Sequence, residues 1–136
     1  MHFVISGTWR PTDPTRAMLP FILAASAVQD GDTVTLMLFH DAVLMAVDGA
    51  GAKLVPVGPP NRYEEVASHP NVILWACRPC VDARGLAPSS LDHRVKLGGM
   101  NDFTQPQSSP TQRWSPFREN TRSPDGTRWR DNRAAA

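Results

Sequence analysis

The chain has 136 residues, of which 41% are hydrophobic and 20% charged, with a formal net charge of +1. This length allows one domain with a hydrophobic core and is too short for two ordinary domains. The longest mostly apolar stretch, residues 17–28, falls well short of the roughly 20 apolar residues that span a bilayer, and the N-terminus lacks the basic residues of a signal peptide. We therefore expect a cytoplasmic protein with no membrane association.

Short apolar runs alternate with helical patterns along the first three quarters of the chain. The runs predict strands at residues 2–6, 33–39, 72–76 and 95–97, and a poor or edge strand at 54–57, which contains a proline. Helices are predicted at residues 13–29, 41–47, 61–68 and 78–84; the first of these opens with Asp13-Pro14, a strong helix start. Strands alternating with helices predict a single α/β domain, with a mainly parallel central sheet flanked by helices.

The composition changes after Phe103. Residues 104–136 are rich in Pro, Ser, Arg, Asn and Gln and have no apolar period, so we expect a domain over residues 1–103 and a disordered Pro/Arg-rich tail over 104–136. Arg113-Trp114 and Arg128-Trp129-Arg130 interleave charge with stacking surface, as single-strand nucleic-acid binding does. Because six Arg against three acids leave only a charge of +3 on the tail, we favour a solvated segment and do not expect a nucleic-acid partner.

Two cysteines, Cys77 and Cys80, follow the predicted strand at residues 72–76 and begin the next helix. In a reducing compartment such a pair indicates catalysis or metal binding rather than a structural disulfide. A zinc site would need a second pair of ligands, and His69 and His93 do not have that spacing. We therefore expect chemistry at the thiols and no metal.

Reaction at a thiol requires the thiolate, whose formation a helix N-terminus and nearby cations favour. Cys77 precedes the predicted helix, and Arg78 and Arg84 add positive charge, so we expect the pKa of Cys77 to be lowered by about one or two pH units. Cys77 is predicted to be more reactive than Cys80. The alternative is that either cysteine is a small buried hydrophobe. The Gly-Ala-Gly at 49–51 is a weak dinucleotide pattern, and no cofactor is expected.

The segment Cys77-Arg78-Pro79-Cys80 also imitates the C-x-P-C of thioredoxins. In that fold a long stretch of strands and helix follows the motif, whereas here residues 81–103 are the only predicted ordered part that remains. The chain has little room for a thioredoxin fold.

Several motifs together resemble the DsrE/DsrF-like family over residues 1–103. They are the apolar first strand with Gly7, Asp13-Pro14, Leu19-Pro20-Phe21, Phe39-His40-Asp41-Ala42-Val43 and Cys77-x-x-Cys80-x-x-x-Arg84-Gly85-Leu86. The resemblance implies a compact α/β domain with a parallel sheet, commonly assembled as trimers or hexamers, in which members of sulfur relays pass a persulfide from one cysteine to the next protein. Cys77 falls on the family's sulfur-carrying position, and Cys80 is present in only some relatives. After Phe103 this chain departs from the family, which would finish with apolar residues.

Other polar residues follow the first two predicted strands. His40 and Asp41 come directly after residues 33–39, so we place them at the same edge of the sheet as Cys77, where they would position or protonate a thiol; the alternative is a solvated loop. Trp9 and Arg10 follow the first strand and either rim the same cleft or lie on the ordinary surface.

These observations favour a cytoplasmic sulfur-handling protein that acts through Cys77, as a persulfide carrier or a sulfurtransferase component. Its partners would be sulfur donor and acceptor proteins, and we expect a homo-oligomer, a trimer or a hexamer. One alternative is a dithiol/disulfide oxidoreductase that uses Cys77 and Cys80. Another is a non-catalytic oligomeric binding domain.

Overall fold

The computed structural model describes residues 1–104, and its centre is a four-stranded parallel sheet in the order β1-β2-β3-β4. The strands are β1 (His2–Gly7), β2 (Thr33–Leu38), β3 (Val72–Cys77) and β4 (Lys96–Gly98). All three neighbouring pairs are parallel, so the carboxyl ends of the strands lie at one edge of the sheet. The predicted α/β class and the parallel sheet are confirmed.

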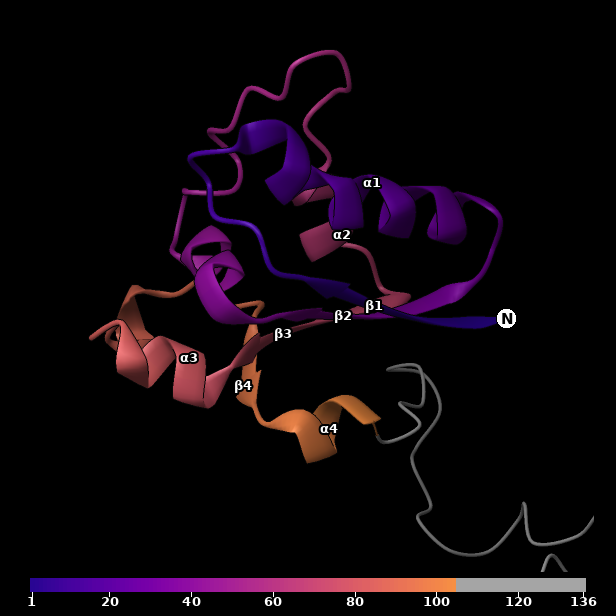
Figure 1. The fold of residues 1–136 in the computed structure, drawn as a ribbon. Coiled ribbons are helices and arrows are strands. Elements are labelled where there is room, and N and C mark those ends of the chain that lie inside the picture. Colours follow the sequence, from indigo (N-terminus) through magenta and orange to yellow (C-terminus); the bar gives the residue numbers. More distant parts are fainter. Residues whose placement is uncertain (105–136) are drawn as a thin grey trace, which may run out of the picture.

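Helices cover both faces of this sheet. The α-helices are α1 (Pro14–Gln29), α2 (Tyr63–Ala67), α3 (Arg78–Ala83) and α4 (Met100–Thr104), and two short 3-10 helices are η1 (His40–Ala46) and η2 (Pro88–Ser90). Figure 1 shows α1 and α2 on one side of the sheet and α3 and α4 on the other, with η1 at the end of β2.

The start of α1 is fixed locally, as the sequence predicts. The Asp13 carboxylate accepts a hydrogen bond from the Arg16 backbone N–H at 3.1 Å, and Pro14 occupies the first turn, where its missing donor costs nothing. The helix then lies against β1, so closely that a side chain on Gly7 would place its Cβ 3.1 Å from the Pro20 ring. This close approach sets where the loop after β1 leaves the sheet.

The core is centred on β2, which is buried from Val34 to Leu38. Such a continuous run of buried positions is expected of a parallel strand with helices on both faces. Met18 and Phe21 of α1 and Val43 of η1 are also fully buried in this core. Removal of a large side chain here, as in Leu36→Ala, would cost about 2–5 kcal/mol of stability.

The prediction of an edge strand at residues 54–57 is wrong. The segment belongs to the long loop between η1 and α2, and Val55 and Val57 are each 81% exposed. Pro56 has no N–H for a ladder, and the Asn61 side-chain amide instead donates to the backbone carbonyls of Gly51 and Leu54, both at 2.8 Å. The loop is thus held by a side chain rather than by strand pairing.

A buried polar network fastens the segment before β4 to α2. Asp92 accepts hydrogen bonds from the Tyr63 hydroxyl at 3.0 Å and from Arg94 Nη2 at 2.7 Å, and Arg94 also bonds Glu64. The Arg94 guanidinium, against the opposing effect of burial, lowers the pKa of Asp92 to about 2. Burial and the Asp92 carboxylate raise the pKa of Tyr63.

The domain boundary predicted after Phe103 lies inside α4, which ends at Thr104. The tail predicted to be disordered falls almost entirely outside the described residues. Within residues 1–104, none of the helices combines the length and the apolar character that crossing a bilayer requires.

Candidate functional site

Three connections at the carboxyl edge of the sheet bring polar and thiol groups together. Arg10 follows β1, His40 and Asp41 begin η1 directly after β2, and β3 runs through Cys77 into α3, which carries Cys80. In α/β proteins this edge is where ligands and reactive groups are placed. The strand order runs without reversal, so the connections themselves, rather than a crevice at a topological switch, build the site.

Asp41 is at the centre of a charged cluster. Arg10 donates to Asp41 Oδ2 through Nε at 2.8 Å and also through Nη2, and Arg84 donates to Oδ1 through Nε at 3.0 Å and Nη2 at 2.7 Å. The hydrogen bonds from Arg10 and then Arg84 lower the pKa of Asp41 to about 2. The carboxylate is therefore ionised at neutral pH, and two guanidinium groups surround it.

Arg84 connects this cluster to the cysteine segment. Besides its contacts with Asp41, it donates from Nη1 to the backbone carbonyl of Cys80 at 3.0 Å. One side chain, only 21% exposed, thus bonds both η1 and α3. The relative position of the two elements is fixed by charge-assisted hydrogen bonds, which are among the strongest that proteins form.

The two cysteines begin the same helix but differ in burial. Cys77 is the residue that caps α3, and it is 7% exposed, whereas Cys80, in the first turn, is partly exposed. The sulfur of Cys80 accepts a hydrogen bond from the His40 backbone N–H at 3.2 Å. Both cysteines are free in this structure.

The expected lowering of the Cys77 pKa is wrong in direction. Burial raises the pKa of the Cys77 thiol and the hydrogen bond with the Cys80 side chain raises it further, while the Cys80 backbone amide and the Arg84 charge act in the opposite sense. The helix start and the cation inferred from the sequence do act on Cys77. They are outweighed because the same residue also lies in the core, which no local motif reveals.

His40 has a backbone conformation unusual for a residue with a side chain. Its φ is 52°, in the left-handed region where His is tolerated better than most residues. The imidazole is 72% exposed, with Nδ1 3.6 Å from Asp41 Oδ2. The ring is thus mostly in solvent, and it is the backbone amide of His40 that contacts the Cys80 sulfur.

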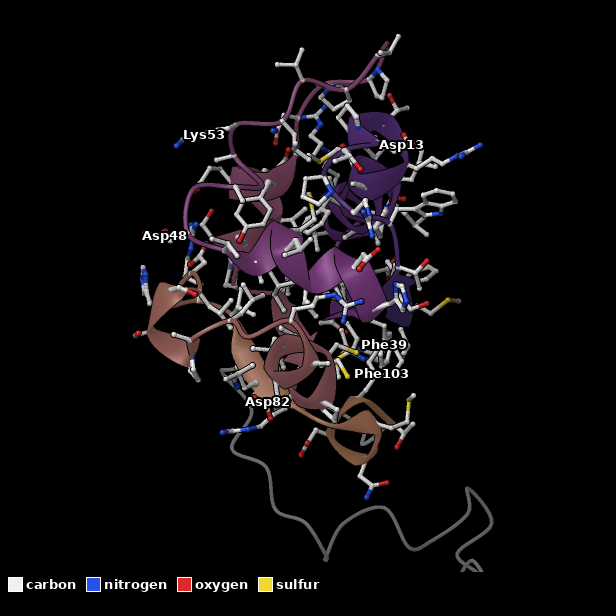
Figure 2. The ribbon with its side chains drawn as sticks, turned by 60° about the vertical axis from the view of Figure 1, so that its left-hand side comes forward. Asp13, Phe39, Asp48, Lys53, Asp82 and Phe103 are labelled. Carbon is white, nitrogen blue, oxygen red and sulfur yellow. The ribbon has the colours of Figure 1, made fainter. Side chains whose placement is uncertain are left out.

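The structure does not bring every expected residue into the cluster. Arg78 forms an ion pair with Asp82 at 3.8 Å on the exposed side of α3, and Asp82 is seen there in Figure 2. Trp9 stacks on Arg16, 4.5 Å from ring centroid to guanidinium carbon, and lines a hollow of about 330 Å³ between β1 and α1 that neither cysteine borders.

Arg10 is a stronger member of the site than sequence reasoning indicated. The sequence places it either at the rim of the cleft or on the ordinary surface, yet it donates directly to the Asp41 carboxylate. The available signal was its position after β1, at the same edge as Asp41, together with the need of a partly buried carboxylate for cationic partners.

An aromatic contact covers one side of the site. Phe39, the residue before His40, packs edge to face against Phe103 of α4 with ring centroids 5.4 Å apart, and Figure 2 shows the two rings side by side. α4 thereby supports the turn that carries the His40 amide.

Within residues 1–104 no group of three or more His, Cys, Asp or Glu side chains is arranged to hold a metal ion. The chemistry that this arrangement supports is that of two adjacent thiols beside a cluster of two cations and one carboxylate.

Comparisons with known proteins agree with this fold. A family model described as the DsrE/DsrF-like family matches residues 1–110. A solved structure described as the crystal structure of ychN protein from E. coli is similar with a TM-score of 0.58 and 22% sequence identity, over 72% of this chain and 84% of that chain. At that identity the likeness concerns the fold. A search of curated proteins found no match.

Proposed function

Because the chain belongs to the DsrE/DsrF-like family, we propose that it carries or transfers sulfane sulfur on its Cys77–Cys80 pair, as a component of a sulfur relay. The observation that carries this proposal is the position of the two cysteines at the carboxyl edge of the sheet, where Cys77 caps α3 and Cys80, in its first turn, is partly exposed. The partners would be a sulfur donor protein and a sulfur acceptor protein, and the compartment the cytoplasm.

The loading step needs one thiolate and a donor persulfide. The thiolate attacks the outer sulfur of the donor, a new sulfur–sulfur bond forms on the protein, and the donor leaves as its own thiolate, so that the proton stays on the transferred sulfur. No net oxidation takes place. The reverse exchange with an acceptor thiolate delivers the sulfur onward.

The charges around the pair suit anionic reactants. Arg10 and Arg84 contribute two positive charges against the single negative charge of Asp41. Such a surplus raises the local concentration of negatively charged persulfides and polysulfides. Sulfur chemistry at this edge is thus supported by both the thiols and their surroundings.

A second candidate is a dithiol oxidoreductase, which the two free cysteines at C-x-x-C spacing at the start of α3 favour. In that case the pair would alternate between two thiols and an intramolecular disulfide, without carrying sulfur. A third candidate, a non-catalytic binding domain, predicts no change at either cysteine.

Mass spectrometry after incubation with inorganic polysulfide separates these functions. A sulfur carrier gains one sulfur atom on Cys77 or Cys80, a dithiol loses two hydrogens, and a binding domain is unchanged. The double variant C77S/C80S is the control for sulfur bound elsewhere. Absence of any gain of sulfur in the wild-type chain, with this donor and with a persulfidated protein donor, would contradict the proposal.

We also propose that the protein is a homo-oligomer, a trimer or a hexamer. β1 is an edge strand, and beside it Trp9, Leu19 and Leu23 expose about half of their surface around the hollow between β1 and α1. A second copy would cover this apolar surface and the open strand edge. Light scattering tests it, since a mass near 14.9 kDa that does not change with concentration would show a monomer.

A further inference from the structure

The two thiols of the pair have different electrostatic surroundings. Cys80 is partly exposed and accepts a hydrogen bond from the His40 N–H at 3.2 Å, whereas Cys77 is 7% exposed and lies in the core. Hydrogen-bond donors stabilise a thiolate, and burial destabilises it. Negative charge on the pair is therefore held better on Cys80.

We propose that Cys80 is the thiol that accepts sulfur, that the His40 backbone amide is the donor that stabilises its thiolate, and that Cys77 is the resolving thiol. The sulfur chemistry in this inference rests on the proposed function. The assignment differs from the one implied by the family resemblance, in which Cys77 carries the sulfur.

The structure contains a device that holds the His40 amide against the sulfur. The left-handed φ of His40 turns the chain from β2 into η1 with the N–H directed at Cys80. Arg84 then bonds both the Cys80 carbonyl and the Asp41 carboxylate next to His40. The His40 backbone thus holds the amide, and Arg84 holds the segment that carries the Cys80 sulfur. A hydrogen-bond donor that stabilises developing negative charge has to be held in place in this way.

The resolving step follows from the C-x-x-C spacing, which places Cys77 at the cap of α3 and Cys80 in its first turn. Once Cys80 carries a persulfide, Cys77 attacks its inner sulfur; the Cys77–Cys80 sulfur–sulfur bond forms, and the bond to the outer sulfur breaks. The outer sulfur leaves as hydrogen sulfide with the proton of Cys77. The sulfane sulfur is reduced, the two cysteines are oxidised to a disulfide, and a dithiol reductant resets the pair.

Alkylation tests the assignment without any sulfur donor. With limiting iodoacetamide at neutral pH, Cys80 should be labelled at least about tenfold faster than Cys77, because a hydrogen bond to a charged group shifts such an equilibrium by roughly ten- to hundredfold. C77S should keep fast labelling and C80S should lose it. Fast labelling that survives in C80S and disappears in C77S would overturn the inference.

Two variants of His40 separate the amide from the imidazole. Both His40→Gly and His40→Val remove the ring, but glycine adopts a positive φ freely and a β-branched residue does not. Labelling of Cys80 should stay near the wild-type rate in the glycine variant and fall by about tenfold in the valine variant. His40→Ala, with a weaker conformational penalty, replaces valine if that variant does not fold. If Cys80 labelling slows equally in both variants, the imidazole is responsible. If it slows in neither, the His40 amide does not stabilise the Cys80 thiolate.

Reaction with inorganic polysulfide tests the resolving step. Wild type should first gain one sulfur and then, as hydrogen sulfide is released, end two hydrogens lighter than the starting chain. C77S should retain one extra sulfur on Cys80, and C80S should neither load nor release. Loading of C80S at the wild-type rate would overturn this inference and leave the proposed function intact. Failure of the wild type, C77S and C80S alike to take up or release sulfur would contradict the proposed function, while the alkylation order would still decide which thiol is reactive.

Discussion

Two aspartates of this domain are clamped by arginine, and they are not equivalent. Asp41 bonds Arg10 and Arg84 at the carboxyl edge of the sheet, and Asp92 bonds Arg94 and Tyr63 between α2 and β4. The pKa of each is lowered to about 2 by hydrogen bonds from arginine. Judged by charge and pKa alone, the two clusters are the same kind of feature.

Their neighbours make the difference. Asp92 is almost completely buried, and its partners join an irregular segment to a helix. Asp41 shares Arg84 with the carbonyl of Cys80, and the next residue back, His40, donates to the Cys80 sulfur. A perturbed pKa therefore does not by itself identify a functional site. The two thiols beside the Asp41 cluster do so.

Of the two aspartates, Asp92 should have the larger effect on stability. Asp92→Ala should lower the free energy of unfolding by about 3 kcal/mol, because it leaves the buried Tyr63 hydroxyl without its partner and removes one of the two carboxylates that bond the partly buried Arg94. Urea denaturation measures this loss. Alkylation of the cysteines in the folded variant should stay at the wild-type rate. A change in labelling at full folding would mean that the Asp92 cluster also acts on the site.

Asp41→Asn should have the reverse profile. The variant should unfold more easily than wild type by less than Asp92→Ala does, because Arg10 is largely solvated and can return to water. Its rate of sulfur uptake from polysulfide should fall by about tenfold or more, because the link between η1 and α3 is weakened and the amide donor is misplaced. Sulfur uptake at the wild-type rate would show that the Asp41 cluster, like the Asp92 cluster, has only a structural role.

Acid should protonate Asp41 and Asp92 over the same pH range, so both clusters should lose their ion pairs together. Each carboxyl has a pKa of about 2 in the folded protein, compared with about 3.9 when unfolded. A carboxyl whose pKa is lower in the folded state stabilises the protein fully at pH values above its unfolded pKa. This stabilisation is lost as the pH falls through its folded pKa. The stability difference between wild type and Asp41→Asn should therefore be constant above about pH 4 and disappear towards pH 2. A difference that fades near neutral pH would mean that another group is responsible.

Arg78→Ala should have the smallest effect. Its ion pair with Asp82 is exposed and 3.8 Å long, and such pairs contribute roughly 0–1 kcal/mol. Sulfur uptake and alkylation should match wild type within about twofold, since solvent screens an exposed charge of this kind. Arg84→Ala, at the residue that ends the same helix, is the matched comparison and should slow both. Equal losses from the two variants would mean that positive charge near α3, rather than the specific contacts of Arg84, matters.

The elements of this fold could be read from local patterns. Residues 33–38 form a buried strand because a run of apolar and β-branched side chains is stable only when it is covered on both faces. Asp13-Pro14 starts α1 because the Asp13 side chain accepts from a free helix N–H and Pro14 has no N–H that needs an acceptor. The motif around Cys77 and Cys80 placed the thiols after a strand. These are short-range effects, and the residues that produce them are neighbours in the sequence.

What the sequence determined by itself is therefore the α/β class, the four strands that form the sheet and the edge at which the thiols lie. The tertiary structure alone decided that Arg10 and Arg84, which are 31 and 43 residues from Asp41, bond the same carboxylate. It also decided that Cys77 is buried enough for its pKa to rise, and that the His40 amide, 40 residues from Cys80, meets the sulfur. Contacts of this kind depend on how strands pair and helices pack, so the chemistry of the pair is set by groups that no local motif connects.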